Sequence, residues 1–175
     1  MDPVSNDPLS PVNPMTFEDA WAQLLINEGG FTVDRGGATK YGISQNSYPQ
    51  EDIANLTEER AQFLYQRDFW VPASCDSLPS LIRFEVFDSA VQMCAPGHPE
   101  VAIRLLQRAA GMAHYDQDGQ LGPQTLLAVG TIPPWRLLVR FLGVRIAYYT
   151  SLPETLWHES GRGWMNRVSN NALHA

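Results

Sequence analysis

The chain has 175 residues, is 44% hydrophobic, and carries 19 acidic against 12 basic side chains, a formal net charge of −7 at pH 7. This length and hydrophobic share suffice for one well-buried domain or for two small lobes that share a core. The acidic balance argues against nucleic acid, because phosphate binding needs clustered Lys and Arg. No stretch reaches the ~18 apolar residues of a membrane span and no secretory signal is recognised, so we expect cytoplasmic synthesis without a membrane span.

Residues 1–15 are predicted to form a disordered tail. Four prolines interrupt it among Asp, Asn and Ser, so it can form no helix and has too little apolar surface to fold. Ordered structure is then expected to begin at Thr16, which has the pattern of a helix N-cap with an acidic residue three positions later. Apolar residues at helical spacing continue to Leu25, and Gly29 with Gly30 ends this predicted helix.

The next segment, residues 31–48, combines glycines, β-branched residues and aromatic residues without a helical period. This pattern predicts a short hairpin or loop lobe. Helical patterns then follow at residues 57–70, 79–93 and 99–110, after Pro123, from Pro134, and in two pieces after Pro153. Six or more helices around one minimal β element predict an α+β, mainly α, architecture.

Glu28 is the candidate catalytic acid. It lies seven residues after Trp21, on the same helix face as the apolar stripe, and it stands in the last turn of the first predicted helix. Desolvation and the negative end of the helix dipole both disfavour a charged carboxylate there, so its pKa is expected to rise. A general acid needs such a proton near neutral pH to protonate a leaving oxygen. The alternative is a solvated residue at a frayed helix end.

The polar loop that follows Glu28 supplies further candidates. Two glycines turn the chain there, and Asp34, Thr39, Tyr41 and Gln45 are expected to return toward the carboxyl group. Hydroxyl, amide and carboxylate groups along a cleft wall suit a sugar polymer as the ligand. Tyr41 and Gln45 fit sugar stacking and N-acetyl recognition, and packing of the lobe is the alternative role for the aromatic ring.

Several of these segments resemble a known family. The run Glu-Gly-Gly-Phe at 28–31, together with residues 36–44, is similar to the signature of glycoside hydrolase family 108, which are lysozyme-like N-acetylmuramidases found mostly in bacteriophages and prophages. Residues 64–70 and 87–91 resemble the second and third helical motifs of that family. Residues 118–125 resemble a turn of small helical peptidoglycan-binding modules, and residues 163–167 resemble the end of the module that is usually fused behind this hydrolase.

The resemblance covers about residues 17–168 and implies a two-lobed, lysozyme-like fold. Residues 16–95 would form the catalytic region, and residues 96–175 a helical peptidoglycan-binding region packed as the second lobe of the same globule. Glu28 would be the acid of a muramidase that cuts the β-1,4 bond after N-acetylmuramic acid. One departure is that the segment between the two signature motifs, residues 31–35, is shorter and poorer in Asp than is usual in the family.

The second catalytic group is either Asp34 or Thr39. In their order along the chain, Glu28, Asp34 and Thr39 are similar to the Glu, Asp and Thr constellation of phage-type lysozymes, in which the second group holds the attacking water. Inversion would require a carboxylate separation of roughly 6.5 to 9.5 Å and retention one of about 5 to 5.5 Å. Asp34 has an alternative role as a turn residue or as a partner of Arg35.

Other polar residues are interpreted as structural. Asp88 interrupts an apolar helix and is expected to be a buried hydrogen-bond acceptor, with a second catalytic carboxylate as the alternative. Cys75 and Cys94 are expected to be two thiols and not a bridge. The histidines show no metal-ligand spacing, and residues 116–118 indicate a plain turn, not a calcium loop, so neither metal nor cofactor is expected.

The sequence thus predicts a monomeric peptidoglycan hydrolase that binds glycan strands and lyses the bacterial cell wall. It would reach the wall through a holin pore or, as an antibacterial effector with an immunity protein, through a secretion machine. A lytic transglycosylase, in which Glu28 serves alone as acid and base, is a second chemistry for the same residues. The alternative outside enzymes is a wall-binding or virion component in which catalysis is weak or lost.

Overall fold

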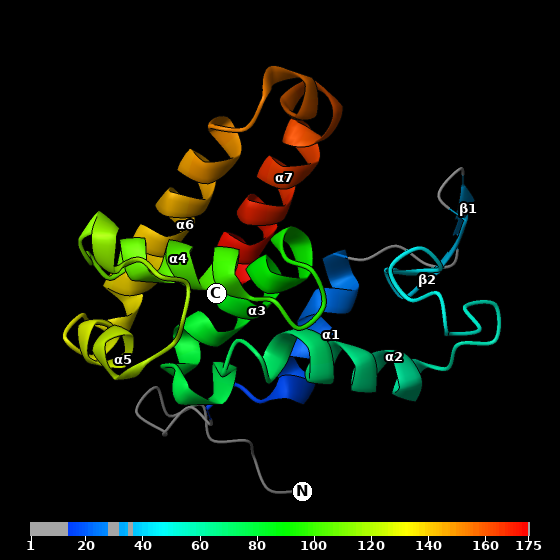
Figure 1. Ribbon diagram of the computed structural model, residues 1–175, viewed down its shortest axis with the longest axis horizontal. Helices are drawn as coiled ribbons and strands as arrows, with labels where there is room; N and C mark the ends of the chain where they lie inside the picture. Colours follow the sequence, from blue (N-terminus) through cyan, green and yellow to red (C-terminus); the bar gives the residue numbers. More distant parts are fainter. Residues whose placement is uncertain (1–13, 28–31, 35–36, 175) are drawn as a thin grey trace, which may run out of the picture.

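The computed structural model describes residues 14–27, 32–34 and 37–174. Within these ranges the chain folds into seven α-helices, three short strands and three short non-α helical turns (Figure 1). In order they are α1 Phe17–Asn27, β1 Thr32–Asp34, β2 Gly37–Lys40, β3 Ile43–Ser44, α2 Glu58–Tyr65, η1 Gln66–Trp70, η2 Cys75–Ser77, α3 Ser80–Met93, α4 Glu100–Ala109, η3 His114–Asp116, α5 Pro123–Gly130, α6 Pro134–Thr150 and α7 Glu154–His174. The predicted α+β, mainly α, architecture with six or more helices is confirmed.

The start of α1 follows from its cap. The Thr16 amide donates to the Asp19 carboxylate over 3.0 Å, and the Asp19 amide donates back to the Thr16 hydroxyl over 3.2 Å. These two bonds satisfy amides that a helix start leaves without partners inside the helix. Just before the cap, Met15 is tied to α3, because its amide donates to the Ser80 hydroxyl over 2.7 Å. The rest of the predicted tail, residues 1–13, lies outside the described residues.

The hairpin predicted at 31–48 is a three-stranded antiparallel sheet in the order β1-β2-β3. It stands beside the helical body (Figure 1). Lys40 pairs with Ile43, so β2 and β3 are joined by the two residues Tyr41 and Gly42. Both have positive φ, 53° and 75°, as a tight hairpin turn of this length requires. Tyr41 is held in this disfavoured conformation by Tyr65, whose hydroxyl donates to its carbonyl oxygen over 3.0 Å.

The core centres on α3, which packs against α1, α4 and α6. Three aromatic rings fill the region between α1, η1 and α3, with centroids 5.5 to 5.8 Å apart in edge-to-face arrangements: Phe17, Trp70 and Phe87. Helices α6 and α7 lie side by side and rise from this core (Figure 1). The buried face of α3 therefore packs against α1 near the N-terminus and against α4 and α6 in the second half of the chain.

Apolar length alone could suggest a membrane segment near α5 and α6. Among the described residues, no single helix is long and apolar enough to cross a membrane. Only α5 and α6 taken together pass that test, and they are bent by 114° at the break between them. In addition, α6 carries the fully buried Arg145, which pairs with side chains of α3.

Two elements differ from the sequence predictions. The helix predicted to run to Trp70 changes after Tyr65 into a π-helical turn, in which the Val71 amide donates to the Gln66 carbonyl over 2.9 Å. The end of the chain, predicted as two pieces, is one continuous helix, α7. Gly161 does not break α7 because its missing side chain makes room for the Trp157 ring, which lies 2.7 Å from the position of a Cβ atom.

Substitution of Gly161 by Ala is therefore expected to lower the free energy of unfolding by about 1–3 kcal/mol, because the new methyl group overlaps a large aromatic ring. Gly163 is a matched control two residues away, since a Cβ there meets no atom within 4 Å. Gly163→Ala should raise stability by up to about 1 kcal/mol, the helix-propensity gain. Urea unfolding of both variants tests the contrast, and an equal gain in both would contradict it.

Candidate active site

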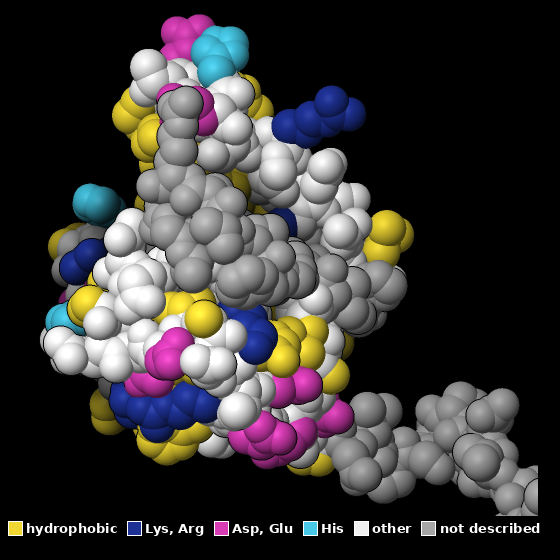
Figure 2. Space-filling view, turned by 90° about the vertical axis from the view of Figure 1, so that its right-hand side faces the viewer, with side chains coloured by type: hydrophobic (Ala, Val, Ile, Leu, Met, Phe, Trp, Pro, Cys, Tyr) yellow, Lys and Arg dark blue, Asp and Glu magenta, His cyan; other side chains and the backbone are white. Residues whose placement is uncertain are grey.

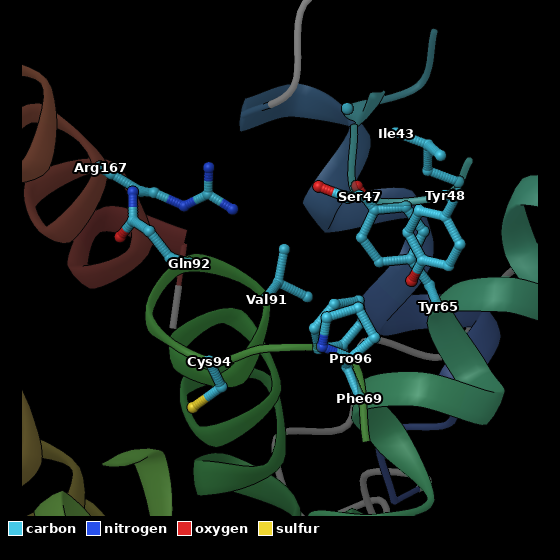
Figure 3. A pocket seen from close by; sticks show the side chains of 11 residues that line it. Ile43, Ser47, Tyr48, Tyr65, Phe69, Val91, Gln92, Cys94, Pro96 and Arg167 are labelled. Atoms are coloured by element: carbon cyan, nitrogen blue, oxygen red, sulfur yellow. The ribbon is translucent and has the colours of Figure 1, made fainter. Parts of the chain in front are cut away.

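A cavity of about 320 Å³ lies between the hairpin and the helical body (Figure 3). It draws on four parts of the chain: the turn and loop after β2, the end of α2 with η1, the end of α3 with its following loop, and α7. The lining residues are Gly42, Ile43, Ser47, Tyr48, Tyr65, Phe69, Val91, Gln92, Cys94, Pro96 and Arg167. The cavity thus combines apolar walls with hydroxyl, amide and guanidinium groups, a combination typical of small-ligand sites.

Tyr65 joins the hairpin and α1 to this cavity. Its hydroxyl holds the Tyr41 carbonyl at the hairpin turn, and its ring lies 5.2 Å from the ring of Trp21 on α1. Helix α1 therefore runs beside the cavity wall, as its ribbon does in Figure 3. The π-helical turn directly after Tyr65 brings Phe69 to the same cavity. Wide helical turns of this kind occur often at functional sites.

A second cavity of about 430 Å³ adjoins the first along α7. The two share Gln92 and Arg167, so they meet at these side chains. The remaining lining residues are Glu159, Ser160, Gly163, Trp164, Asn166 and Asn170. Trp164 is supported from behind by Tyr149, because the two rings stack with centroids 4.9 Å apart. These two adjoining cavities are called the hollow below, and Trp164 adds an aromatic side chain to its lining.

A buried ionic cluster beneath the junction holds Arg167 in place. Asp88 on α3 accepts from Arg167 Nε at 2.9 Å and lies 2.7 Å from Arg167 Nη2. Its other oxygen accepts from Arg145 on α6 at 2.8 Å and from Asn171 on α7 at 2.9 Å. Arg145 also pairs with Glu85 at 2.6 Å. The cluster joins three helices, and it confirms Asp88 as a buried structural acceptor.

The pKa values of the two carboxyl groups in this cluster, Asp88 and Glu85, are shifted in opposite directions. Burial by itself would raise the pKa of Asp88, but the Arg145 and Arg167 guanidiniums outweigh burial and hold that pKa below its usual range. Burial dominates for Glu85 and raises its pKa in spite of Arg145. Among the described residues, one oxygen of Glu85 has no hydrogen-bond partner, so this carboxyl group is less well satisfied than that of Asp88.

Comparison with known proteins finds a family model for each half of the chain. Residues 21–94 match the family model Glycosyl hydrolase 108, and residues 101–169 match the model "Predicted Peptidoglycan domain". The resemblance to glycosyl hydrolase family 108 is therefore confirmed for residues 21–94. The chain is a glycoside hydrolase, and the match to the second model supports peptidoglycan as its substrate.

Among solved structures, the chain is similar to one described as "Structure of Brucella abortus SagA", with a TM-score of 0.75 and 28% sequence identity. The match covers 89% of this chain and 90% of that chain. No curated protein matches the sequence at a significant level. The likeness therefore extends over both matched regions and supports the lysozyme-like fold as a whole.

The predicted site residues of the enzyme lie in different places. Glu28 falls outside the described residues. Asp34 is the last residue of β1, and the structure describes its backbone alone. Thr39 lies half-buried on β2, paired with Thr32 on one side and Ser44 on the other. Their catalytic roles stay predictions.

Tyr41 and Gln45 flank the first cavity without being among its lining residues. Tyr41 occupies the hairpin turn and packs against the core. The Gln45 amide nitrogen donates to three carbonyl oxygens of its own loop, those of Tyr48, Pro49 and Glu51, at 3.0 to 3.4 Å. Gln45 therefore closes the loop that carries Ser47 and Tyr48 to the cavity. Substrate recognition by Tyr41 and Gln45 stays a prediction.

The sequence interpretation missed four polar side chains that line the first cavity: Tyr48, Tyr65, Gln92 and Arg167. Tyr48 is fixed by Asp68, which accepts from its hydroxyl at 2.9 Å. The four residues come from separate elements, so no local motif relates them. Tyr65 and Arg167 lay in recognised motifs, at the second helical motif and at the end of the peptidoglycan module, and neither motif carried an indication of their role.

Both cysteines are free thiols, as predicted. Cys75 is buried under α3, and burial raises the pKa of its thiol. Cys94 lines the first cavity, and burial raises its pKa as well. Neither is therefore an activated nucleophile, which needs a lowered pKa. In the part of the chain that the structure describes, no group of three or more His, Cys, Asp or Glu could hold a metal ion.

Proposed function

We propose that this enzyme is an N-acetylmuramidase that cleaves the β-1,4 bond between N-acetylmuramic acid and N-acetylglucosamine, with Glu28 as the general acid. The supporting observation is the location of the first cavity. Helix α1 ends at Asn27 beside the cavity, and the chain returns to line it from Gly42. In the sequence, Glu28 directly follows α1, and the hairpin that carries Gly42 and Ile43 begins four positions later.

The surroundings of α1 support a raised pKa for Glu28. The residue follows the C-terminal end of the helix, where the dipole is negative. It also comes four residues after Leu24 and seven after Trp21, both of which are buried. Helical spacing relates it to this apolar face. A carboxyl group in such a setting keeps its proton near neutral pH and can give it to the glycosidic oxygen.

The hairpin offers two groups for the attacking water, Asp34 and Thr39. Thr39 pairs with Thr32, and Asp34 pairs with Gly37, two residues before Thr39. Because paired residues and every second residue along a strand share one face of a sheet, positions 34 and 39 lie on the same face. This register supports a shared role, with one of them orienting the water opposite Glu28.

Mass spectrometry of the products from purified sacculi tests the bond and the chemistry together. A muramidase that uses water releases fragments that end in reducing N-acetylmuramic acid. Fragments that end in reducing N-acetylglucosamine would contradict the proposed bond. Anhydromuramic ends, lighter by one water, would show that Glu28 acts without a water-holding partner, as in a lytic transglycosylase.

A further inference from the structure

Arg167 is the one Lys or Arg side chain among the described residues that line the two cavities. Its side chain points from α7 toward the first cavity (Figure 3) and is 11% exposed. The contacts with Asp88 fix its guanidinium at the junction. On the face shown in Figure 2, Lys and Arg side chains lie in small separate groups, without a broad basic surface. The chain as a whole carries a net charge of −7, so the positive charge of Arg167 in the hollow is a local feature.

The charge around Arg167 favours an anion. Two guanidiniums, those of Arg145 and Arg167, share the buried cluster with Asp88 and Glu85. With two guanidiniums and two carboxyl groups, the cluster carries at least as much positive as negative charge in either protonation state of Glu85. The acidic residue that lines the second cavity, Glu159, is exposed to solvent.

Neutral amides complete the second cavity. Gln92 lies at the junction, and Asn166 and Asn170 stand one helical turn apart on the exposed side of α7. Amide side chains both donate and accept hydrogen bonds, so they can pair with peptide or acetamido groups. The hollow thus presents a fixed cation next to several amides, and a substrate that carries a carboxylate beside amide groups matches this order.

We propose that the Arg167 guanidinium binds a carboxylate of the peptidoglycan substrate, with Gln92, Asn166 and Asn170 contacting the amide groups next to it. This inference rests on the proposed function. Arginine pairs with carboxylates through charge-assisted hydrogen bonds in a fixed geometry. The carboxylate can belong to the stem peptide or, in strands without stems, to the lactyl group of muramic acid. Oligomers of N-acetylglucosamine have none, so this contact discriminates peptidoglycan from chitin. Asp88 is a positioning residue for Arg167.

Binding measurements in a Glu28→Gln background test the proposal without turnover. Three soluble tetrasaccharides serve as probes: a muropeptide with stem peptides, the same glycan stripped by an amidase, and N-acetylglucosamine tetramer. The parent should bind the carboxylate-bearing probes more tightly than the tetramer. Arg167→Met should weaken the binding of the carboxylate-bearing probe that Arg167 contacts by about 10- to 100-fold and leave the binding of the tetramer unchanged. The probe that loses affinity identifies the source of the carboxylate.

Arg162→Met is the matched control, because Arg162 is exposed on the same helix and lines neither cavity.

Asn166→Asp provides a second variant that leaves the buried cluster intact, since Asn166 is exposed. It adds a negative charge to the second cavity and should also weaken the carboxylate probes selectively. Equal affinity of the parent for all three probes, or a preference that survives both substitutions, would overturn the inference. If the wild type still releases muramic ends from sacculi in that case, the proposed function stands without it. If the wild type releases no fragments, the proposed function itself fails.

Discussion

Glu28→Gln is expected to slow the clearing of permeabilised Gram-negative cells by about 10²- to 10⁴-fold. Glutamine keeps the size and the hydrogen-bonding capacity of the side chain but has no proton to transfer to the leaving oxygen. Because the amide preserves the shape of the site, the variant should still sediment with purified sacculi. The loss should therefore appear in the rate of lysis and not in the binding of the wall.

A carboxylate elsewhere on the same helix controls for a general effect of charge. Glu18 is exposed in the first turn of α1, far along the helix from its C-terminal end. Glu18→Gln should clear cells at the rate of the wild type, with at most a few tenths of a kcal/mol lost from the helix dipole. Equal clearing by the wild type and Glu28→Gln would exclude Glu28 as the acid.

Asp88→Asn is expected to lower the free energy of unfolding by about 3–5 kcal/mol, as when one partner of a buried ion pair is removed. Asp88 accepts from two guanidiniums at 2.7 to 2.9 Å and is fully buried. Asparagine cannot neutralise Arg145 and Arg167, so both cations lose their shared partner. Glu85→Gln should cost less, because burial opposes the ionised form of Glu85 and raises its pKa. Urea denaturation of the two variants measures the difference, and equal losses would contradict it.

The free energy of unfolding is predicted to depend on pH through Asp88. The folded pKa of Asp88 lies below its ordinary value, so its ionised form stabilises the fold. This contribution is fully present above the unfolded pKa of about 4 and is lost as the pH falls through the folded pKa. Glu85 has the opposite sign, since a raised pKa favours the fold at low pH and costs stability as the pH rises.

The wild type should therefore lose stability below about pH 4, and Asp88→Asn should lose less over the same interval. Glu85→Gln should retain the acid loss, because Asp88 is still present. Unfolding in urea at a series of pH values from 2 to 7 provides the comparison. The assignment would be wrong if Asp88→Asn and the wild type declined in parallel.

Local features of the fold were predictable because a few neighbouring residues determine them. The cap of α1 needs Thr16 and Asp19 alone, which bond to one another as their spacing indicates. The hairpin followed from glycines and β-branched residues, and the start of α6 from Pro134, whose fixed φ suits the first helical position. The π-helical turn after Tyr65 had no such signal. It depends on how Phe69 and Trp70 pack against the core.

The candidate site divides in the same way. Sequence motifs directed attention to Glu28 and to the loop after it, since both belong to one continuous segment. Tyr65, Gln92 and Arg167 come from three separate helices and meet only where those helices pack around the cavity. For Gln45 the structure adds what the sequence could not show, namely that its amide donates to the carbonyls of its own loop, and its role in sugar recognition stays a prediction.

The sequence by itself determined the helical character of the chain, its hairpin, its caps and the motifs that carry the family resemblance, because each of these depends on residues a few positions apart. The tertiary structure decided which distant side chains share a hollow and which charge it contains. Arg167 and Asp88 are 79 positions apart, yet they form the ion pair that places a cation at the junction of the two cavities. Burial makes that contact strong, and burial is a property of the packed chain and not of any segment.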